Sequence, residues 1–218
     1  MDTGLVCKLR IELADQKTRT MGAPFKQGSL YFEYAGQEEK KLLPHVLLKT
    51  LDISRLENLS YAEFSSQLTC EIKKSAWKRI IESIEKKDRS TKEVYGKLSS
   101  EGFPEDTVDE FIALAQNKKL LDDLRFAESF IRSKKIKGWG RKKIEYELRL
   151  RGINASELEN YPHAFFNPDE EVEIAYTLLS KKSLPDKNAY QKFYRLLAAK
   201  GFSSDVISTA ISLRLNEE

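Results

Sequence analysis

Apolar and polar residues repeat one helical pattern three times between residues 90 and 205. In each copy two apolar residues lie four positions apart. A glycine follows four positions after the second of them, and a third apolar residue comes directly after the glycine. This spacing keeps the apolar residues on one helical face, and the glycine favours the end of that helix. A period of about fifty residues indicates an array of helical repeats. The copies end in Leu98-Ser-Ser-Glu-Gly102-Phe103, Leu148-Arg-Leu-Arg-Gly152-Ile153 and Leu197-Ala-Ala-Lys-Gly201-Phe202.

Each repeat is predicted to contain three helices. Ser60-Tyr-Ala-Glu63 and Ser90-Thr-Lys-Glu93 have the form of capping boxes, which begin a helix. The helix from Ser90 carries Leu98, and a further helix begins at Pro104. The other predicted helices span residues 60–87, 122–135, 141–151, 155–161, 168–182, 188–200 and 204–215.

The first fifty residues follow a different pattern, in which apolar and polar residues alternate as they do in strands. We therefore expect a small antiparallel β element with an exposed edge. Its predicted parts are strands at 6–13, 30–34 and 41–43, a loop marked by Gly22, Pro24 and Gly28, a turn at 36–39 and a short helix at 44–51.

Together these patterns predict a mainly all-α fold. Tandem three-helix repeats are expected to form an elongated curved array, with a small antiparallel β element at the N-terminus. Each unit is too small to bury much core alone, so stacking between repeats is expected to contribute to stability. The predicted domains are the N-terminal β element at 1–55, a linking helix and first repeat at 56–121, a second repeat at 122–166 and a third at 167–218.

Composition narrows the class of protein. Of the 218 residues, 33% are charged and 40% are hydrophobic, which is typical of a folded chain in water. Cys7 and Cys70 are the only cysteines, so we expect reduced thiols and no zinc site. Neither a signal-peptide pattern nor an apolar run of membrane-spanning length occurs in the sequence. We expect a cytoplasmic, monomeric protein that makes no contact with a membrane.

Positive charge is concentrated in the second repeat. Residues 132–151 include nine basic and two acidic residues, whereas residues 167–218 include seven basic and eight acidic ones. Such a run is usually a solvated helix face. Here it crosses a helix end, the turn Lys137-Gly-Trp-Gly140 and the next helix, with almost no interspersed acids, which favours a patch. The phosphates of a nucleic acid or the acidic side chains of a protein would both suit it.

Three segments of the second repeat also carry a resemblance. They are Leu121-Asp-Asp-Leu-Arg-Phe-Ala-Glu-Ser-Phe-Ile-Arg132, Lys137-Gly-Trp-Gly-Arg-Lys-Lys-Ile144 and Glu147-Leu-Arg-Leu-Arg-Gly-Ile153. They closely resemble the central repeat of the RecX family of bacterial RecA regulators. Residues 90–94 and 98–103 are similar to the family's first repeat, and the third repeat matches in its Leu-x-x-x-Gly-Phe pattern and helix lengths. Trp139 is a departure, since a basic or small residue is commoner between the two glycines.

The resemblance implies a regulator and not a catalyst. RecX proteins lie in the helical groove of the RecA filament on single-stranded DNA and usually lower its ATP hydrolysis, strand exchange and co-protease activity. We therefore expect a protein that binds this filament and inhibits it. The alternative is a stand-alone single-stranded nucleic-acid-binding protein that uses the same patch without RecA.

The expected contacts lie in the second repeat. Lys142, Tyr146 and Arg149 share a helical face where a base could stack, although a tyrosine half-packed between repeats fits the spacing equally well. Trp139 is expected either to meet a partner or to clamp a neighbouring helix, and the amides behind Gly140 could bind an anion. The predicted partner-binding residues are Arg125, Arg132, Lys135, Lys137, Trp139, Arg141, Lys142, Tyr146, Arg149 and Arg151.

Catalysis is not expected. His45 and His163, the only histidines, lie beside no nucleophile or ligand set, and no hydrolase, zinc-protease or phosphate-loop motif occurs. Asp122 and Asp123 resemble a carboxylate pair, but their place at a helix start favours a cap and a charge that complements the helix dipole. We expect no metal and no cofactor.

Overall fold

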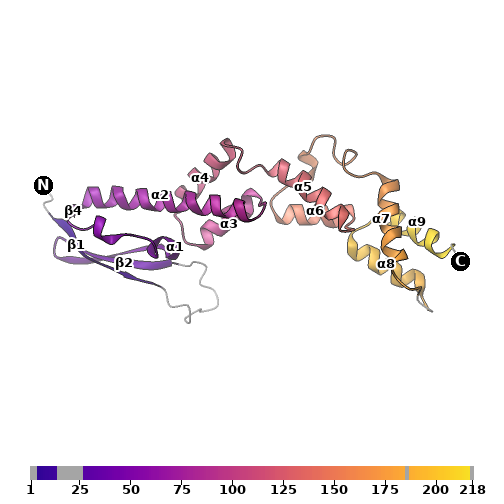
Figure 1. Ribbon diagram of the computed structural model, residues 1–218, viewed down its shortest axis with the longest axis horizontal. Coiled ribbons are helices and arrows are strands. Elements are labelled where there is room, and N and C mark those ends of the chain that lie inside the picture. The colour runs from indigo at the N-terminus through magenta and orange to yellow at the C-terminus, as the bar shows by residue number, and fades with distance from the viewer. Residues whose placement is uncertain (1–3, 14–26, 185–186, 217–218) are drawn as a thin grey trace. The chain divides into compact units, whose positions relative to one another are not determined.

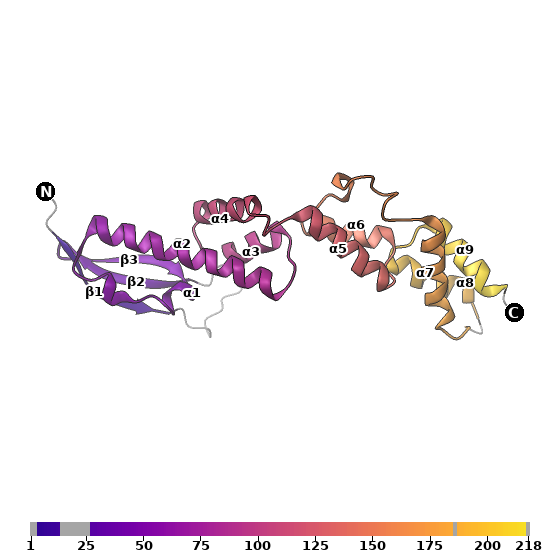
Figure 2. The ribbon, with the colours of Figure 1, turned by 45° about the horizontal axis from the view of Figure 1, so that its top comes forward.

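The computed structural model describes residues 4–13, 27–184 and 187–216. Along the chain, a small N-terminal sheet is followed by a series of helices (Figure 1 and Figure 2). The predicted combination of a mainly helical chain with an N-terminal antiparallel sheet is confirmed. The chain divides into two units, residues 1–121 and 122–218. The finer division into four domains stays a prediction.

The sheet is antiparallel, with the strand order β3-β2-β1-β4. Its β2–β3 hairpin turns at Ala35 and Gly36, which both have positive φ, so the turn is shorter than the predicted residues 36–39. Gly28 pairs with Leu43 inside the sheet, and its assignment to the loop was wrong, whereas Gly22 and Pro24 lie outside the described residues. The strands are β1 (Leu5–Glu12), β2 (Gln27–Tyr34), β3 (Gln37–Pro44) and β4 (Leu59–Ser60), and α1 (His45–Leu48) and a 3-10 turn (Ile53–Arg55) connect the last two.

Helix α2 (Tyr61–Lys86) belongs to two hydrophobic cores, and it lies along the sheet in both ribbon views (Figure 1 and Figure 2). Phe64, near its start, packs against the buried side of the sheet, and the Phe64 and Phe32 rings lie 4.7 Å apart. Ile80, near its end, packs into the core of the first repeat. A continuous helix therefore joins the sheet to the first repeat.

The first repeat is completed by α3 (Thr91–Ser100) and α4 (Glu105–Asn117). Both predicted capping boxes are present. The side chains of Ser60 and Ser90 accept a hydrogen bond from the backbone N–H of Glu63 and Glu93, and the carboxylates of these glutamates accept from the N–H of the serines. Local sequence therefore determines where α2 and α3 begin.

The second unit contains α5 (Asp123–Ile136), α6 (Arg141–Leu150), α7 (Pro168–Ser180), α8 (Ala189–Lys200) and α9 (Ser204–Leu215). The predicted helix at 155–161 is wrong, because only a 3-10 turn (Ala155–Glu157) forms there. Asn160 has positive φ and Pro162 disfavours a helical residue before it, so the turn does not continue. Leu158 and Phe166 are still buried against α5 and α6, and this segment covers the core that a third helix would cover.

The threefold glycine pattern is present in the structure. Gly102, Gly152 and Gly201 have φ of +85°, +79° and +87°, the left-handed conformation that glycine adopts without strain. The N–H of the next residue reaches back to the carbonyl of the leucine five positions earlier at 3.0–3.3 Å, as in a Schellman motif. Each of these apolar residues is buried: Phe103, Ile153 and Phe202.

Candidate partner-binding face

The start of α6 is held against the third repeat by backbone contacts. The Gly140 N–H donates to the carbonyl of Lys200 at 2.9 Å, and the Lys142 N–H donates to the carbonyl of Gly201 at 3.0 Å. A Cβ on Gly140 would lie 2.5 Å from the backbone nitrogen of Phe202, so only glycine permits this approach. We call these contacts the Gly140–Gly201 junction.

A carboxylate completes the same helix end. The Arg141 N–H donates to Oε1 of Glu171 at 3.3 Å, and burial raises the pKa of that carboxyl. The N–H groups of Gly140, Arg141 and Lys142 at the start of α6 thus all have acceptors within the second unit. These contacts compete with an anion behind Gly140, because three of the donors that it would use already have acceptors.

Trp139 acts as a clamp between helices. Its ring is half-buried against the core of the second repeat, with Lys134 Nζ 4.6 Å and Lys143 Nζ 4.5 Å from its centroid. These two lysines come from the end of α5 and the start of α6. Of the two interpretations of Trp139, the structure favours the clamp.

Two of the predicted contact cations are bound within the chain. The Lys135 side chain is only 17% exposed, and its Nζ donates to the carbonyl of Phe165 at 2.6 Å and to Glu170 at 2.8 Å. Arg151 pairs with Glu147 at 2.6 Å on the same helix turn. These side chains stabilise the second unit and present little charge to a partner.

Arg141 is also engaged, in a three-residue network. Its Nε donates to Oε1 of Glu145 at 2.7 Å, and the Tyr161 hydroxyl donates to the same oxygen at 2.6 Å. Burial alone would raise the pKa of Glu145, but the hydrogen bonds from Tyr161 and Arg141 outweigh it and lower that pKa. Burial, together with this hydrogen bond, raises the pKa of the Tyr161 hydroxyl. The network fastens α6 to the segment that replaces the third helix.

Most of the remaining predicted residues are open to solvent. Lys142 and Arg149 are exposed and form no ion pair with any residue that the structure describes, and Tyr146 between them is 55% exposed. We call Lys142, Tyr146 and Arg149 the α6 face. Arg149 also borders a groove of about 730 Å³ whose lining includes Glu145 and Tyr161. Three further predicted cations are exposed outside this face: Arg125, Arg132, which pairs with Glu128 at 3.2 Å, and Lys137.

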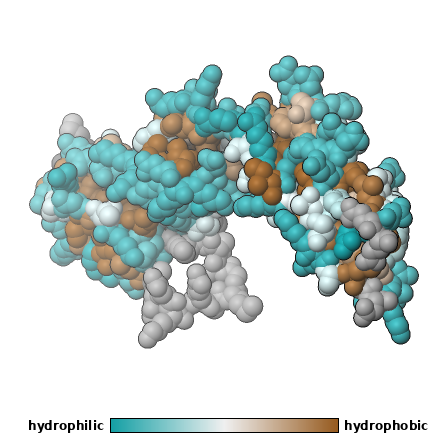
Figure 3. All heavy atoms as spheres, turned by 45° about the vertical axis from the view of Figure 1, so that its right-hand side comes forward, coloured by the Kyte–Doolittle hydropathy of each residue, from teal (hydrophilic) through white to brown (hydrophobic). Residues whose placement is uncertain are grey.

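Hydrophilic side chains make up most of the surface visible in the space-filling view, with hydrophobic residues in smaller patches (Figure 3). Within residues 4–13, 27–184 and 187–216, no group of three His, Cys, Asp or Glu side chains is placed to hold a metal ion. Among the same residues, none of the helices has the length and apolar character needed to span a bilayer.

Asp122 caps α5 by accepting from the Leu124 and Arg125 N–H groups, as its position predicted.

Family models match both repeats of the second unit. The model of the RecX second three-helix domain matches residues 122–160, and that of the third three-helix domain matches residues 169–211. The regulatory protein RecX of Vibrio campbellii is 30% identical over 136 residues, which are 61% of this chain and 86% of the relative. That of Clostridium perfringens is 29% identical over 144 residues, which are 63% and 68% of the two chains.

Solved structures show the same similarity. The crystal structure of RecX from Lactobacillus salivarius is 27% identical, with a TM-score of 0.55, and the match covers 66% of this chain and 96% of the other. A second crystal structure, described as regulatory protein RecX, is 22% identical with a TM-score of 0.60 and covers 96% and 99%. The second likeness concerns the fold and extends over nearly the whole chain, including its N-terminal sheet.

Proposed function

The chain belongs to the RecX family of regulatory proteins, and on this premise we propose that it binds the RecA filament on single-stranded DNA and inhibits it. In this proposal the α6 face supplies the main contact, and Arg125, Arg132 and Lys137 contribute charge around it. The protein acts by binding, without catalysis, in the cytoplasm.

The observation that carries this proposal is the separation of paired from unpaired cations. Lys135, Arg141 and Arg151 are held by acids of the second unit, whereas Lys142 and Arg149 are exposed at both ends of the α6 face. Uncompensated charge on a helix fixed at its N-terminus is preorganised for a negatively charged partner. A nucleoprotein filament offers both phosphates and carboxylates, and Tyr146 adds an aromatic surface between the two cations.

The proposal predicts how the single-stranded-DNA-dependent ATPase of RecA responds to the protein. A filament regulator acts on assembled RecA, so ATPase activity is expected to fall at protein concentrations far below the concentration of DNA binding sites. The measurement is a titration at fixed RecA and DNA, repeated with twice the DNA. A midpoint that doubles with the DNA would instead identify a stand-alone DNA binder, and unchanged ATPase at saturating protein would contradict inhibition.

A further inference from the structure

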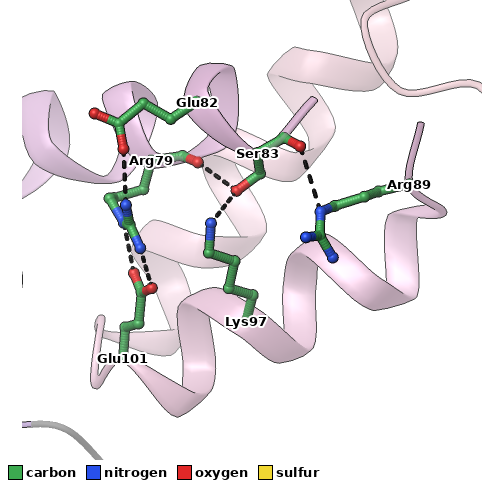
Figure 4. A network of polar contacts seen from close by, with 6 residues as sticks. All are labelled: Arg79, Glu82, Ser83, Arg89, Lys97 and Glu101. Atoms are coloured by element: carbon green, nitrogen blue, oxygen red, sulfur yellow. Dashed lines mark hydrogen bonds and ion pairs between the residues drawn. The ribbon is translucent and has the colours of Figure 1, made fainter. Parts of the chain in front are cut away.

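Two cations of the first unit converge on one buried serine (Figure 4). Ser83 on α2 is 1% exposed, and its hydroxyl donates to the carbonyl of Arg79 at 2.6 Å and accepts from Nζ of Lys97 on α3. The carbonyl of Ser83 accepts from Nε of Arg89, in the connection between these helices, at 3.3 Å. The serine therefore fixes Arg89 and Lys97 beside each other.

The acids of this network are already bound by another arginine. Arg79 donates Nε to Oε2 of Glu101 at 2.8 Å, donates a second N–H to the same carboxylate, and pairs with Glu82 at 2.7 Å (Figure 4). The Glu101 side chain is only 13% exposed, which leaves it little freedom to turn to another cation. Arg89 and Lys97 form no ion pair with any residue in the described part of the chain.

This arrangement places positive charge where it is partly desolvated. Arg89 and Lys97 are both half-buried, and burial, followed by the charge of Arg79, lowers the pKa of Lys97. Arg89 and Lys86 lie close enough to lower it further, while Glu101 acts in the opposite direction. Half-buried like charges that no carboxylate pairs with directly are unfavourable, so an anion at this point would stabilise the folded protein.

A phosphate group matches the unused donors. Arg89 offers a planar fork and Lys97 a point charge, and most of their N–H donors have no acceptor within the network. Tetrahedral phosphate oxygens can accept from both side chains at once. The six residues of Figure 4 include three cations and two carboxylates, a net charge of +1, and Lys86 adds to the positive field at Lys97, which favours an anion here. A phosphate group can use the donors of both side chains with its several oxygens.

We propose that Arg89 and Lys97, positioned by Ser83, form a binding site for a phosphate group in the first unit. This site is separate from the α6 face and does not depend on RecA. Its ligand is either free phosphate or a terminal phosphate of a nucleotide or oligonucleotide.

Isothermal titration calorimetry of the full chain with inorganic phosphate, at constant ionic strength, tests the site. Arg89→Gln and Lys97→Gln are each expected to weaken phosphate binding by about tenfold or more, because each removes a charged hydrogen-bond donor. Lys92→Gln changes an exposed lysine of the same helix, and Lys142→Glu with Arg149→Glu changes the α6 face; both should bind phosphate as the wild type does.

Arg89→Gln leaves both bonds of the Ser83 hydroxyl in place, so it carries the test if Lys97→Gln does not fold. Equal phosphate affinity of wild type and Arg89→Gln, or no phosphate binding by the wild type, would overturn the proposal. Acetate that binds at this site as tightly as phosphate would overturn the assignment to phosphate. In a second arm, oligothymidylates with and without a 5′-phosphate compete with inorganic phosphate, and displacement by the phosphorylated one alone identifies a terminal phosphate as the ligand.

Discussion

Replacing Gly201 with alanine is expected to destabilise the second unit by about 3 kcal/mol. Gly201 has φ of +87°, which a Cβ disfavours, and that Cβ would lie 2.4 Å from both N and Cβ of Lys143. The same glycine provides the carbonyl that accepts from the Lys142 N–H, so its displacement also opens the Gly140–Gly201 junction. Urea unfolding followed by the fluorescence of Trp139, with Trp77→Phe as the background, measures the change.

Two further variants separate the effect of backbone conformation from that of close packing at the Gly140–Gly201 junction. Gly140→Ala should destabilise in the same direction without any change of backbone preference, because Gly140 has φ of −81° and only the close approach opposes a Cβ. Gly96→Ala is the matched control, since Gly96 lies within α3 with no atom within 4 Å of the added Cβ. That control lies in the first unit and should raise the stability of that unit by up to about 1 kcal/mol, as followed by the fluorescence of Trp77 in a Trp139→Phe background. A Gly201→Ala protein as stable as the wild type would show that the junction does not hold the repeats together.

Reversing the charge of the α6 face should abolish regulation while leaving the fold intact. Lys142→Glu combined with Arg149→Glu is expected to weaken binding to RecA filaments on single-stranded DNA at least about tenfold, because each change replaces attraction by repulsion. The urea midpoint should stay close to that of the wild type, since both side chains are exposed and form no ion pair in the described structure. Fluorescence anisotropy of labelled protein with preformed filaments measures the affinity.

The matched control is a second pair of exposed cations in the same unit. Lys192→Glu with Arg195→Glu makes the same change of charge on α8, outside the α6 face. Its affinity for the filament should remain within about twofold of the wild type if position, and not net charge, determines binding. Equal losses in the two double variants would mean that only the overall charge of the unit matters.

The sequence predicted the elements whose formation depends on residues close together along the chain. The glycine-ended helices were recognised because spacing and a C-terminal glycine act within one helix, as the Leu98–Phe103 segment shows. The segment at 155–161 was misassigned because helix propensity competes there with Asn160 and Pro162. The contact between Gly140 and Gly201 was not predictable, since it joins residues 61 positions apart through tertiary packing.

In the candidate site, too, local pairings could be read from the sequence and tertiary ones could not. Arg141 and Glu145, and Glu147 and Arg151, lie four positions apart, a spacing that favours ion pairs within a helix. This signal could have shown that both arginines are paired within the chain and are weaker candidates for partner contacts. The pairing of Lys135 with an acid of α7 had no such signal. Arg89 and Lys97 were missed because Ser83 on α2 positions them from a different element, the connection to α3 for Arg89 and α3 itself for Lys97.

The most direct measurement is photo-crosslinking from the centre of the α6 face. A benzophenone amino acid at Tyr146 should crosslink to RecA when filaments on single-stranded DNA are present, and the same probe at Tyr190, 45% exposed on α8, should crosslink much less. Because the probe reacts only with what touches it, the product identifies the partner of this face. Crosslinks from Tyr146 to DNA alone, or strong RecA crosslinks from Tyr190 with none from Tyr146, would contradict the proposed RecA-binding face.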